Sequence, residues 1–394
     1  MAESPQSSLP SSIVQQRPLL TRLKYRVLAF ALQNLIVGPS LFFRDVKAYF
    51  FPPAIRPDII KTYPCRPRLP VRIFLPPHDP IRGAALFTIH GGGFMVGSPH
   101  DNDTWNAAFA AQYRVPVIGL NYAKTPANPY PGPTDDIEAL LLAVLADPTL
   151  PPIRNAALLG WSAGGNLCAS VAQRPAVRAT RKIVALVPLY PVVDFTLSGQ
   201  VKTAGRRYKA ALGGYRGAGG DVVVGLGELF AHAYMPVGTD RRDPGLSPFF
   251  APREALPKHI FVLGAELDML AAEAWRAACM WAGRRVPEVA EVPGREAVVG
   301  KGELVLESDV DGDERFTREE RERYAWEEKD EDKKGGVRWL LVPDTVHGFD
   351  QNIGPVVKDE VLMEDAQIKT QKTMRIIGEW LVEGAFKDDA EGTA

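Results

Sequence analysis

The stretch Gly160-Trp161-Ser162-Ala163-Gly164-Gly165 decides the fold of this 394-residue chain. The apolar run 157–160 leads into it, and the helical pattern 163–173 follows it. A G-x-S-x-G pattern between a strand and a helix is typical of a nucleophile elbow, in which small residues permit a sharp turn that lifts the serine above the sheet. The helix N-terminus beside Ser162 favours developing negative charge. We therefore interpret Ser162 as a catalytic nucleophile, with a plain tight turn as the alternative.

The chain on both sides of this stretch alternates short apolar runs with amphipathic helical patterns. Such an alternation predicts an α/β fold, with a mostly parallel central sheet and helices on both faces. We expect strands over residues 71–75, 84–89, 117–121, 157–160, 183–189, 260–264 and 337–342. We expect helices over residues 104–113, 133–146, 163–173, 270–282 and 360–382. The Gly-rich, basic segment 195–243 would leave the sheet as an excursion.

A run of three glycines follows the expected strand 84–89, in His90-Gly91-Gly92-Gly93-Phe94. Consecutive glycines free the backbone to aim N–H groups at one point, and acyl transfer needs such donors where an oxyanion develops. We expect Gly92 and Gly93 to be two of these donors and Ala163, directly after the nucleophile, to be the third. His90 is interpreted as an organiser of the loop.

A nucleophilic serine needs a general base. Of the six histidines, only His232, His259 and His347 follow Ser162, as the usual order of such triads requires. His259 begins an apolar strand, and His232 lies in the excursion. His347 comes just after the expected strand 337–342, where a sheet presents its catalytic loops, so it is the predicted base.

The base in turn needs a carboxylate that orients it. Asp268 comes directly after the expected strand 260–264, in Gly264-Ala265-Glu266-Leu267-Asp268. Glu266 is the competing carboxylate in the same stretch, and it could instead lie on the surface or in the pocket wall. We predict Asp268 as the acid of the triad.

Together these motifs make the chain resemble the hormone-sensitive-lipase-like esterases, a group of α/β-hydrolases. The resemblance runs from about Pro70 to Trp281 and resumes from Val337 to the C-terminal helix. The segments that carry it are His90–Phe94, Asn121-Tyr122 through Pro131, Gly160–Gly165, Ser247-Pro248, Ala265–Leu270 and His347–Phe349. The resemblance implies an α/β-hydrolase fold with an N-terminal helical cap, and it implies hydrolysis of carboxylic esters without a metal or another cofactor.

Departures from the family pattern concern the pocket. Trp161 replaces a residue that is usually small or acidic, and with Phe94 we expect it to line the substrate pocket. The Arg and Glu typical of the family's D-Y-R-L-A-P-E segment are Ala123 and Ala127 here. Because both members of that pair are absent, no lone charge is left behind.

The chain divides into a catalytic domain with flanking segments. We expect a disordered tail over 1–18, a cap helix region over 19–60, the catalytic domain over 61–385 and a second tail over 386–394. A charged insertion over 284–336 would interrupt the domain. Its part 307–334 holds 13 acidic and 7 basic residues, so we expect a solvated segment that buries no core.

The apolar run that follows Arg22, Lys24 and Arg26 is shorter than the roughly 20 residues that span a bilayer. We expect an amphipathic helix that packs on the protein through Leu28, Leu32, Leu35 and Ile36. The alternative is membrane association through residues 27–43.

Composition limits the other classes of function. The net charge of −1 argues against a nucleic-acid partner, and three scattered cysteines suit a reducing compartment such as the cytoplasm. Acidic residues at 309, 311, 313 and 320 have the spacing of a calcium loop, but Glu314 stands where that loop needs glycine. We therefore expect no metal site.

The sequence thus predicts hydrolysis of an ester of a hydrophobic small molecule, through an acyl-enzyme on Ser162 with His347 as base and Asp268 as acid. Two other uses of the same triad stay open, an amidase or deacetylase and a lactonase. A ligand receptor on an inactive hydrolase scaffold is a third alternative, and the intact serine and histidine argue against it.

Overall fold

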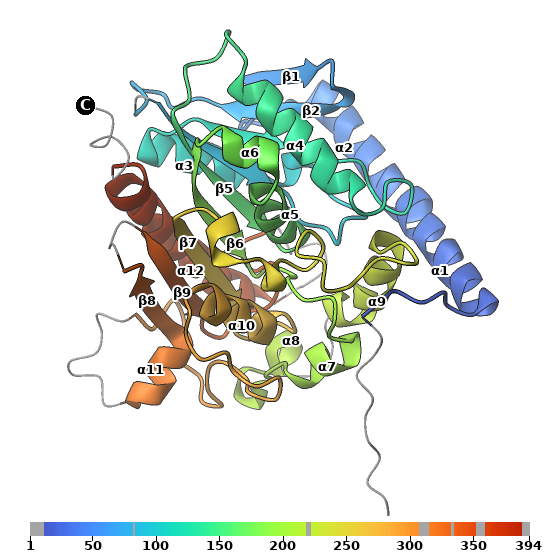
Figure 1. Cartoon of the computed structure of the whole chain (residues 1–394), viewed down its shortest axis with the longest axis vertical. Helices are drawn as coiled ribbons and strands as arrows, with labels where there is room; N and C mark the ends of the chain where they lie inside the picture. The colour runs from blue at the N-terminus through green and yellow to red at the C-terminus, as the bar shows by residue number, and fades with distance from the viewer. Residues whose placement is uncertain are drawn as a thin grey trace, which may run out of the picture.

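The computed structural model describes residues 12–81, 83–217, 222–306, 315–331, 335–351 and 359–387. Within them, nine strands form one sheet in the order β1-β2-β4-β3-β5-β6-β7-β9-β8 (Figure 1). The strands are β1 (Ile59–Tyr63), β2 (Arg66–Phe74), β3 (Ala84–Ile89), β4 (Val117–Leu120), β5 (Asn155–Trp161), β6 (Ile183–Leu189), β7 (His259–Ala265), β8 (Ala325–Lys329) and β9 (Gly336–Val342).

The middle of the sheet, from β4 to β9, is parallel, and β1, β2 and β8 pair antiparallel at its two edges. All seven predicted strands coincide with strands of this sheet, so the α/β prediction is confirmed. The parallel strands are mostly apolar because helices cover both of their faces.

Two hydrophobic cores lie on the two faces of the sheet. One contains side chains of α4 (Gly132–Leu145), α5 (Ala163–Ala172) and α10 (Ala271–Trp281). The other contains side chains of α3 (Asp103–Tyr113) and α12 (Glu360–Trp380). Adjacent residues of β3 illustrate the alternation, since Phe87 belongs to the first core and Leu86 to the second.

The excursion between β6 and β7 forms α7 (Gly199–Ala204), α8 (Gly214–Gly217) and α9 (Val222–Tyr234). Its helix α9 lies beside α1 of the N-terminal region in Figure 1. The remaining helices are the short α6 (Pro175–Ala179) and α11 (Arg318–Tyr324), and a π-helical turn, Leu381–Ala385, ends α12.

The N-terminal region is one long helix. It consists of α1 (Leu19–Ala31), a π-helical turn (Leu32–Val37) and α2 (Gly38–Phe50). The predicted packing face is wrong: Leu28, Leu35 and Ile36 are 42%, 67% and 63% exposed. Of the four predicted residues only Leu32 packs against the protein, together with Tyr25 and Ala29. Spacing identifies an apolar face, but two faces of this helix are apolar, and spacing does not tell which of them the body covers.

Neither tail is wholly free of the body. Val14 is buried, its N–H donates to the carbonyl of Thr239, and its carbonyl accepts from Gly238. At the other end Phe386 is buried in the core. The prediction of a disordered tail is therefore wrong for residues 12–18, and the predicted second tail does not include Phe386, which belongs to the core. Residues 1–11 and 388–394 lie outside the described residues.

The segment 284–336 is part of the domain, which corrects the prediction of a solvated insertion. Strand β8 extends the sheet, and the apolar side chains of Val299, Val305, Phe316, Tyr324 and Trp326 are buried. These few apolar residues are spaced among many charges, so the composition of the segment concealed its contribution to the core.

The residues with calcium-loop spacing fall mostly outside the described residues, which include neither 309–313 nor Glu314. Its last member, Glu320, belongs to the N-cap of α11. The Glu320 carboxylate accepts from the Thr317 N–H at 2.8 Å, and the Thr317 hydroxyl accepts from the Glu320 N–H at 3.1 Å. This reciprocal pair is a capping box.

Candidate active site

The turn after β5 is strained and requires its glycines. Ser162 has φ +53° and ψ −114°, outside the regions that side chains prefer. A Cβ on Gly160 would lie 2.2 Å from the Gly164 carbonyl oxygen, and one on Gly164 would lie 2.1 Å from that of Ile89. The glycines therefore let α5 start directly against the sheet, and this turn places Ser162 at the N-terminus of the helix.

Three side chains from three loops form a continuous hydrogen-bonded line. The Ser162 Oγ lies 2.9 Å from His347 Nε2, and His347 Nδ1 lies 2.7 Å from Asp268 Oδ2. Asp268 is buried, and its other oxygen accepts from the Leu270 N–H at 3.0 Å. The three residues follow β5, β7 and β9, whose carboxyl ends meet at one edge of the parallel sheet.

The competing carboxylate and histidines lie elsewhere. Glu266 is buried in an ionic cluster, 2.7 Å from Lys209 Nζ, and it accepts from the Tyr324 hydroxyl at 2.6 Å. It is thus neither the partner of His347 nor a surface residue. His232 packs on Tyr25 of the N-terminal helix, and His259 is buried at the start of β7.

The glycine loop after β3 bends beside the serine. Gly92 and Gly93 have φ +104° and +57°, and a Cβ on Gly92 would lie 2.3 Å from the Val96 carbonyl oxygen. The N–H groups of Gly92, Gly93 and Ala163 donate to no acceptor within the described part of the chain. They are therefore free to bind an oxyanion next to Ser162.

A buried histidine and a partly buried lysine support this loop from behind. His90 Nδ1 lies 2.7 Å from the Gly91 carbonyl oxygen, and its ring stacks on Tyr122 with centroids 4.4 Å apart. Lys124 Nζ lies 3.0 Å from His90 Nε2. Burial lowers the pKa of His90 far below its usual range, so the ring is neutral, and burial lowers the pKa of Lys124 to about 7. Sequence reasoning missed Lys124, because nothing in its neighbourhood marks it as buried.

Ser162 and His347 open onto a cavity of about 530 Å³ between the sheet and the excursion. Its wall is mainly apolar and includes Phe94, as predicted, with Val96, Val192, Phe195, Leu197, Leu226, Phe230, Met235, Met269 and Leu270. Charged side chains also line it. The Arg17 guanidinium and the Glu228 carboxylate among them lie 2.8 Å apart and neutralise each other.

Trp161 does not line this cavity, which corrects the sequence-based expectation. Its side chain is buried in the opposite core, where its ring meets Trp105 edge to face. Its Nε1–H donates to Asp350 Oδ2 at 2.7 Å, and the Tyr190 hydroxyl donates to the other oxygen of Asp350. Trp161 is the last residue of β5, so strand alternation places it with Leu159 and Ala157, on the side away from the excursion.

Sequence reasoning also missed Tyr190, whose ring meets that of His347 with centroids 4.9 Å apart. Its place directly after β6, at the carboxyl edge of the sheet, is the signal that could have identified it.

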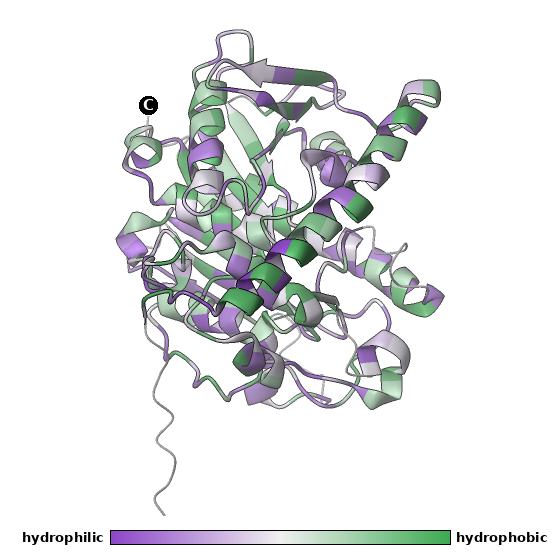
Figure 2. Ribbon diagram, turned by 90° about the vertical axis from the view of Figure 1, so that its right-hand side faces the viewer, coloured by the Kyte–Doolittle hydropathy of each residue, from purple (hydrophilic) through white to green (hydrophobic). Residues whose placement is uncertain are grey.

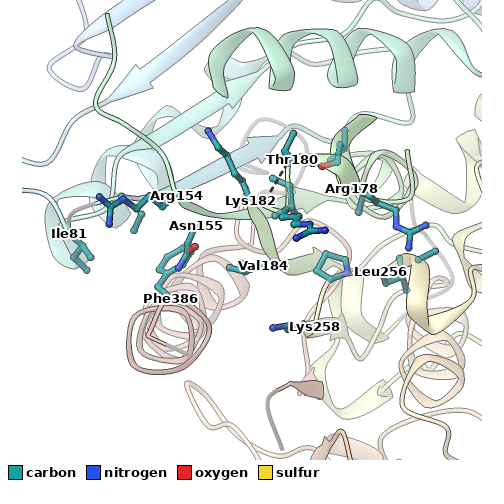
Figure 3. A pocket seen from close by; sticks show the side chains of 18 residues that line it. Ile81, Arg154, Asn155, Arg178, Thr180, Lys182, Val184, Leu256, Lys258 and Phe386 are labelled. Carbon is teal, nitrogen blue, oxygen red and sulfur yellow. Dashed lines mark hydrogen bonds between the residues drawn. The ribbon is translucent and has the colours of Figure 1, made fainter. Parts of the chain in front are cut away.

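A second cavity, of about 890 Å³, opens where β3, β5 and β6 begin (Figure 3). Five basic side chains line it, namely Arg154, Arg178, Arg181, Lys182 and Lys258, and none of its lining residues is acidic. It holds no nucleophile with a base, so it cannot be the site of the hydrolysis. Among the described residues, no group of three or more His, Cys, Asp or Glu side chains is placed to hold a metal ion.

Comparison with known proteins identifies a family and several relatives of this chain. A family model described as the alpha/beta hydrolase fold matches residues 86–297. The ethyl acetate hydrolase of Pseudomonas putida is 32% identical over 241 residues, which are 58% of this chain and 71% of that protein. The mouse hormone-sensitive lipase is 33% identical over 125 residues, 31% of this chain and 16% of that much longer protein.

Solved structures agree in fold. The esterase of Pyrobaculum calidifontis superposes with a TM-score of 0.58 at 20% identity and covers 93% of this chain and 99% of its own. The family match covers more than half of the chain and includes the serine elbow and the acid loop, and the bacterial relative matches 58% of the chain. The chain therefore belongs to the hormone-sensitive-lipase-like esterases of the α/β-hydrolase fold.

Proposed function

We propose that this carboxylic ester hydrolase cleaves esters of hydrophobic small molecules through an acyl-enzyme on Ser162. The observation that carries the proposal is the line from Ser162 through His347 to Asp268, which opens onto an apolar cavity. The arrangement supplies a nucleophile, a base and an orienting carboxylate in hydrogen-bond contact, the set that acyl transfer to a serine requires.

In the first half of the reaction, His347 Nε2 takes the proton of Ser162 as Oγ attacks the carbonyl carbon. The Nδ1–H of the imidazolium donates to Asp268, whose charge stabilises the cation. The N–H groups of Gly92, Gly93 and Ala163 bind the oxyanion that forms. His347 then protonates the leaving oxygen, and the alcohol departs.

The second half repeats these steps with water. His347 takes a proton from the water molecule, the hydroxide attacks the acyl carbon, and His347 returns the proton to Ser162 as the acid leaves. Asp268 and the three N–H donors act as before. No other group is required to balance the atoms or charges.

The substrate class follows from the cavity. A volume of about 530 Å³ with an aliphatic and aromatic wall suits an uncharged, hydrophobic ester. The bacterial relative is named for ethyl acetate, which supports simple alkyl esters as the starting class. The cavity has room for acyl groups well beyond acetyl.

The three cysteines, Cys65, Cys168 and Cys279, are all free thiols, and two of them are buried. A structure that uses no disulfide among these residues suits a reducing compartment, so the location that we propose is the cytoplasm.

The test is hydrolysis of p-nitrophenyl esters of rising acyl length by the wild type, by Ser162→Ala and by Ser198→Ala. Ser198 also lines the cavity, but its hydroxyl accepts from the Val201 N–H at 3.3 Å rather than contacting the triad, so it is a matched control. We expect Ser162→Ala to lose about 10⁶-fold in kcat and Ser198→Ala to stay close to the wild type. An organophosphonate should label Ser162.

Comparable turnover by Ser162→Ala would disprove the mechanism. Faster cleavage of p-nitroacetanilide than of p-nitrophenyl acetate by the wild type would assign the same triad to amides instead.

A further inference from the structure

The N-terminal helix presents an apolar face to solvent along its whole length; Figure 2 shows it crossing the molecule as a mainly hydrophobic rod. Large apolar side chains recur on this face at intervals of mostly three or four residues, and all are exposed. They are Leu20, Leu23, Val27, Phe30, Leu35, Phe42, Phe43, Val46, Tyr49 and Phe50. We call this set the outer face. An exposed apolar surface of this extent marks a site of interaction.

The opposite side of the helix lies against the protein in both of its halves. In α1, Tyr25 and Ala29 pack in a cluster with Met95 and Leu229. In α2, the Arg44 guanidinium donates to the Ser98 hydroxyl at 3.3 Å. One side of the helix therefore packs against the folded domain. The helix cannot cross a membrane without losing these contacts.

Its length also suits a flat position. The helix Leu19–Phe50 has 32 residues and is apolar enough to cross a membrane by composition. At 1.5 Å per residue it is about 48 Å long, against about 30 Å for the hydrocarbon core of a bilayer. Its outer face is apolar and free, while Tyr25 and Ala29 on another side pack on the protein, which is the pattern of a helix that lies in the membrane surface.

The charges of the helix indicate which kind of partner the outer face binds. Residues 19–50 contain five basic side chains, Arg22, Lys24, Arg26, Arg44 and Lys47, and one acidic side chain, Asp45. Lys24, Arg26 and Lys47 are exposed and form no ion pair within the described residues. A second copy of the helix would repel this charge, whereas anionic lipid headgroups attract it.

We propose that the outer face docks on the surface of an anionic lipid bilayer and that the protein is a peripheral membrane enzyme. The apolar side chains enter the boundary between headgroups and acyl chains, and Lys24, Arg26 and Lys47 contact lipid phosphates. Binding of this kind is reversible and depends on salt.

The contacts between the N-terminal helix and the domain also connect the outer face to the active site. Gln33 Nε2 donates to the carbonyls of Met95 and Thr125, at 3.0 and 2.6 Å, and Met95 follows the glycine loop. Val96, Leu226 and Phe230 pack against the cluster that seats the helix, and all three line the catalytic cavity. If the proposed esterase function holds, the docked enzyme therefore takes apolar esters from the bilayer beside its own cavity.

The experiment is flotation of the full chain with vesicles of phosphatidylcholine alone or with 30% phosphatidylglycerol. It uses Ser162→Ala so that no substrate is consumed. Three variants are compared in that background: an outer-face variant, Val27→Ser/Phe30→Ser/Phe43→Ser; a charge variant, Lys24→Gln/Arg26→Gln/Lys47→Gln; and a control, Ile60→Ser/Val237→Ser/Val361→Ser. The control removes equally exposed apolar side chains from other elements.

We expect the parent protein, Ser162→Ala, and the control variant to float with anionic vesicles. The outer-face variant should remain at the bottom of the gradient. Each basic residue near a membrane contributes roughly fivefold to partition, so the charge variant should lose about 100-fold. High salt should release the parent. Circular dichroism shows that the variants are folded. The same substitutions are also made in the active protein that retains Ser162, where hydrolysis of p-nitrophenyl acetate gives a second check of folding.

Three results would overturn the proposal. The first is a parent that stays at the bottom with both vesicle types, and the second is an outer-face variant that still floats. The third is a wild-type dimer in light scattering that the outer-face variant dissociates, with no vesicle binding, which would make a second copy the occupant. Failure of the esterase function shows separately, as absent p-nitrophenyl acetate hydrolysis by the wild type while the Ser162→Ala parent still floats.

Discussion

The Lys209 ammonium lies 2.7 Å from the Glu266 carboxylate, and neither side chain is exposed to solvent. The same ammonium lies 2.7 Å from Asp344. Glu266 stands two residues before Asp268, and Asp344 stands three residues before His347. One lysine from the excursion therefore joins the two loops that carry the acid and the base.

We expect Lys209→Met to destabilise the protein by about 3–5 kcal/mol, because it leaves two carboxylates buried without their cation. The loss of kcat should exceed any change in KM, since the loops of Asp268 and His347 would separate. Urea denaturation and steady-state kinetics measure the two effects. The exposed pair Lys301–Glu364 supplies the control, and Lys301→Met should cost less than about 1 kcal/mol. Equal costs for the two variants would contradict the role of Lys209.

His347→Ala should reduce kcat about as strongly as Ser162→Ala, because members of a triad act as one unit. His232→Ala and His259→Ala should keep most of the activity, since their rings contact Tyr25 of the N-terminal helix and Trp380 of α12. Kinetics of all three variants with p-nitrophenyl butyrate provide the measurement. An inactive His259→Ala with normal stability would refute the assignment of the base.

Trp161→Phe should lower stability by about 1–3 kcal/mol and leave the preference for acyl length unchanged. The variant removes the N–H that donates to Asp350, whose own pKa is raised by burial, and it changes no side chain of the cavity. Denaturation and the p-nitrophenyl ester series test both parts. Phe230→Ala is the comparison, since it enlarges the cavity and should shift the preference toward longer acyl groups by about tenfold. A shift of that size in Trp161→Phe would return Trp161 to the pocket.

Because of the titration of Lys124, we expect the free energy of unfolding to increase as the pH rises from 7 to 10. Burial lowers its pKa from 10.5 to about 7, so over this range the unfolded chain holds a proton that the folded chain lacks. Stability then increases with pH by up to about 1.4 kcal/mol per pH unit. Lys124→Met should lack this increase, and Lys301→Met should retain it. Urea denaturation at pH 7.5 and 9 is the measurement, and identical slopes for wild type and Lys124→Met would contradict the expectation.

The parallel core and the residues of the site were predictable because each has a local signature. Apolar β-branched runs identified the seven central strands, and glycine patterns beside them marked the loops of Ser162 and Gly92. Strand ends then selected His347 and Asp268 for the site, and the structure brings both to Ser162.

Other features depend on tertiary contacts that have no local signature. The apolar residues of β8 and its neighbours are too few to outweigh the charges around them, so the segment looked solvated. Lys209 and Lys124 look like surface lysines in sequence, and only the fold shows that they are buried or nearly so. The pocket prediction for Trp161 is the exception, because strand alternation alone would have placed it in the core.

The edge strand β8 also has a consequence for solubility. Without it, β9 would be the last strand of the sheet, and its sequence Gly-Val-Arg-Trp-Leu-Leu-Val would offer unpaired backbone groups to another molecule. Such an apolar edge is a template for intermolecular β-pairing and aggregation. Strand β8 covers it and ends in Glu327, Glu328 and Lys329, whose charges discourage the addition of a further strand. The acidic segment that the sequence suggested was a solvated insertion thus protects the edge of the sheet from pairing with another molecule.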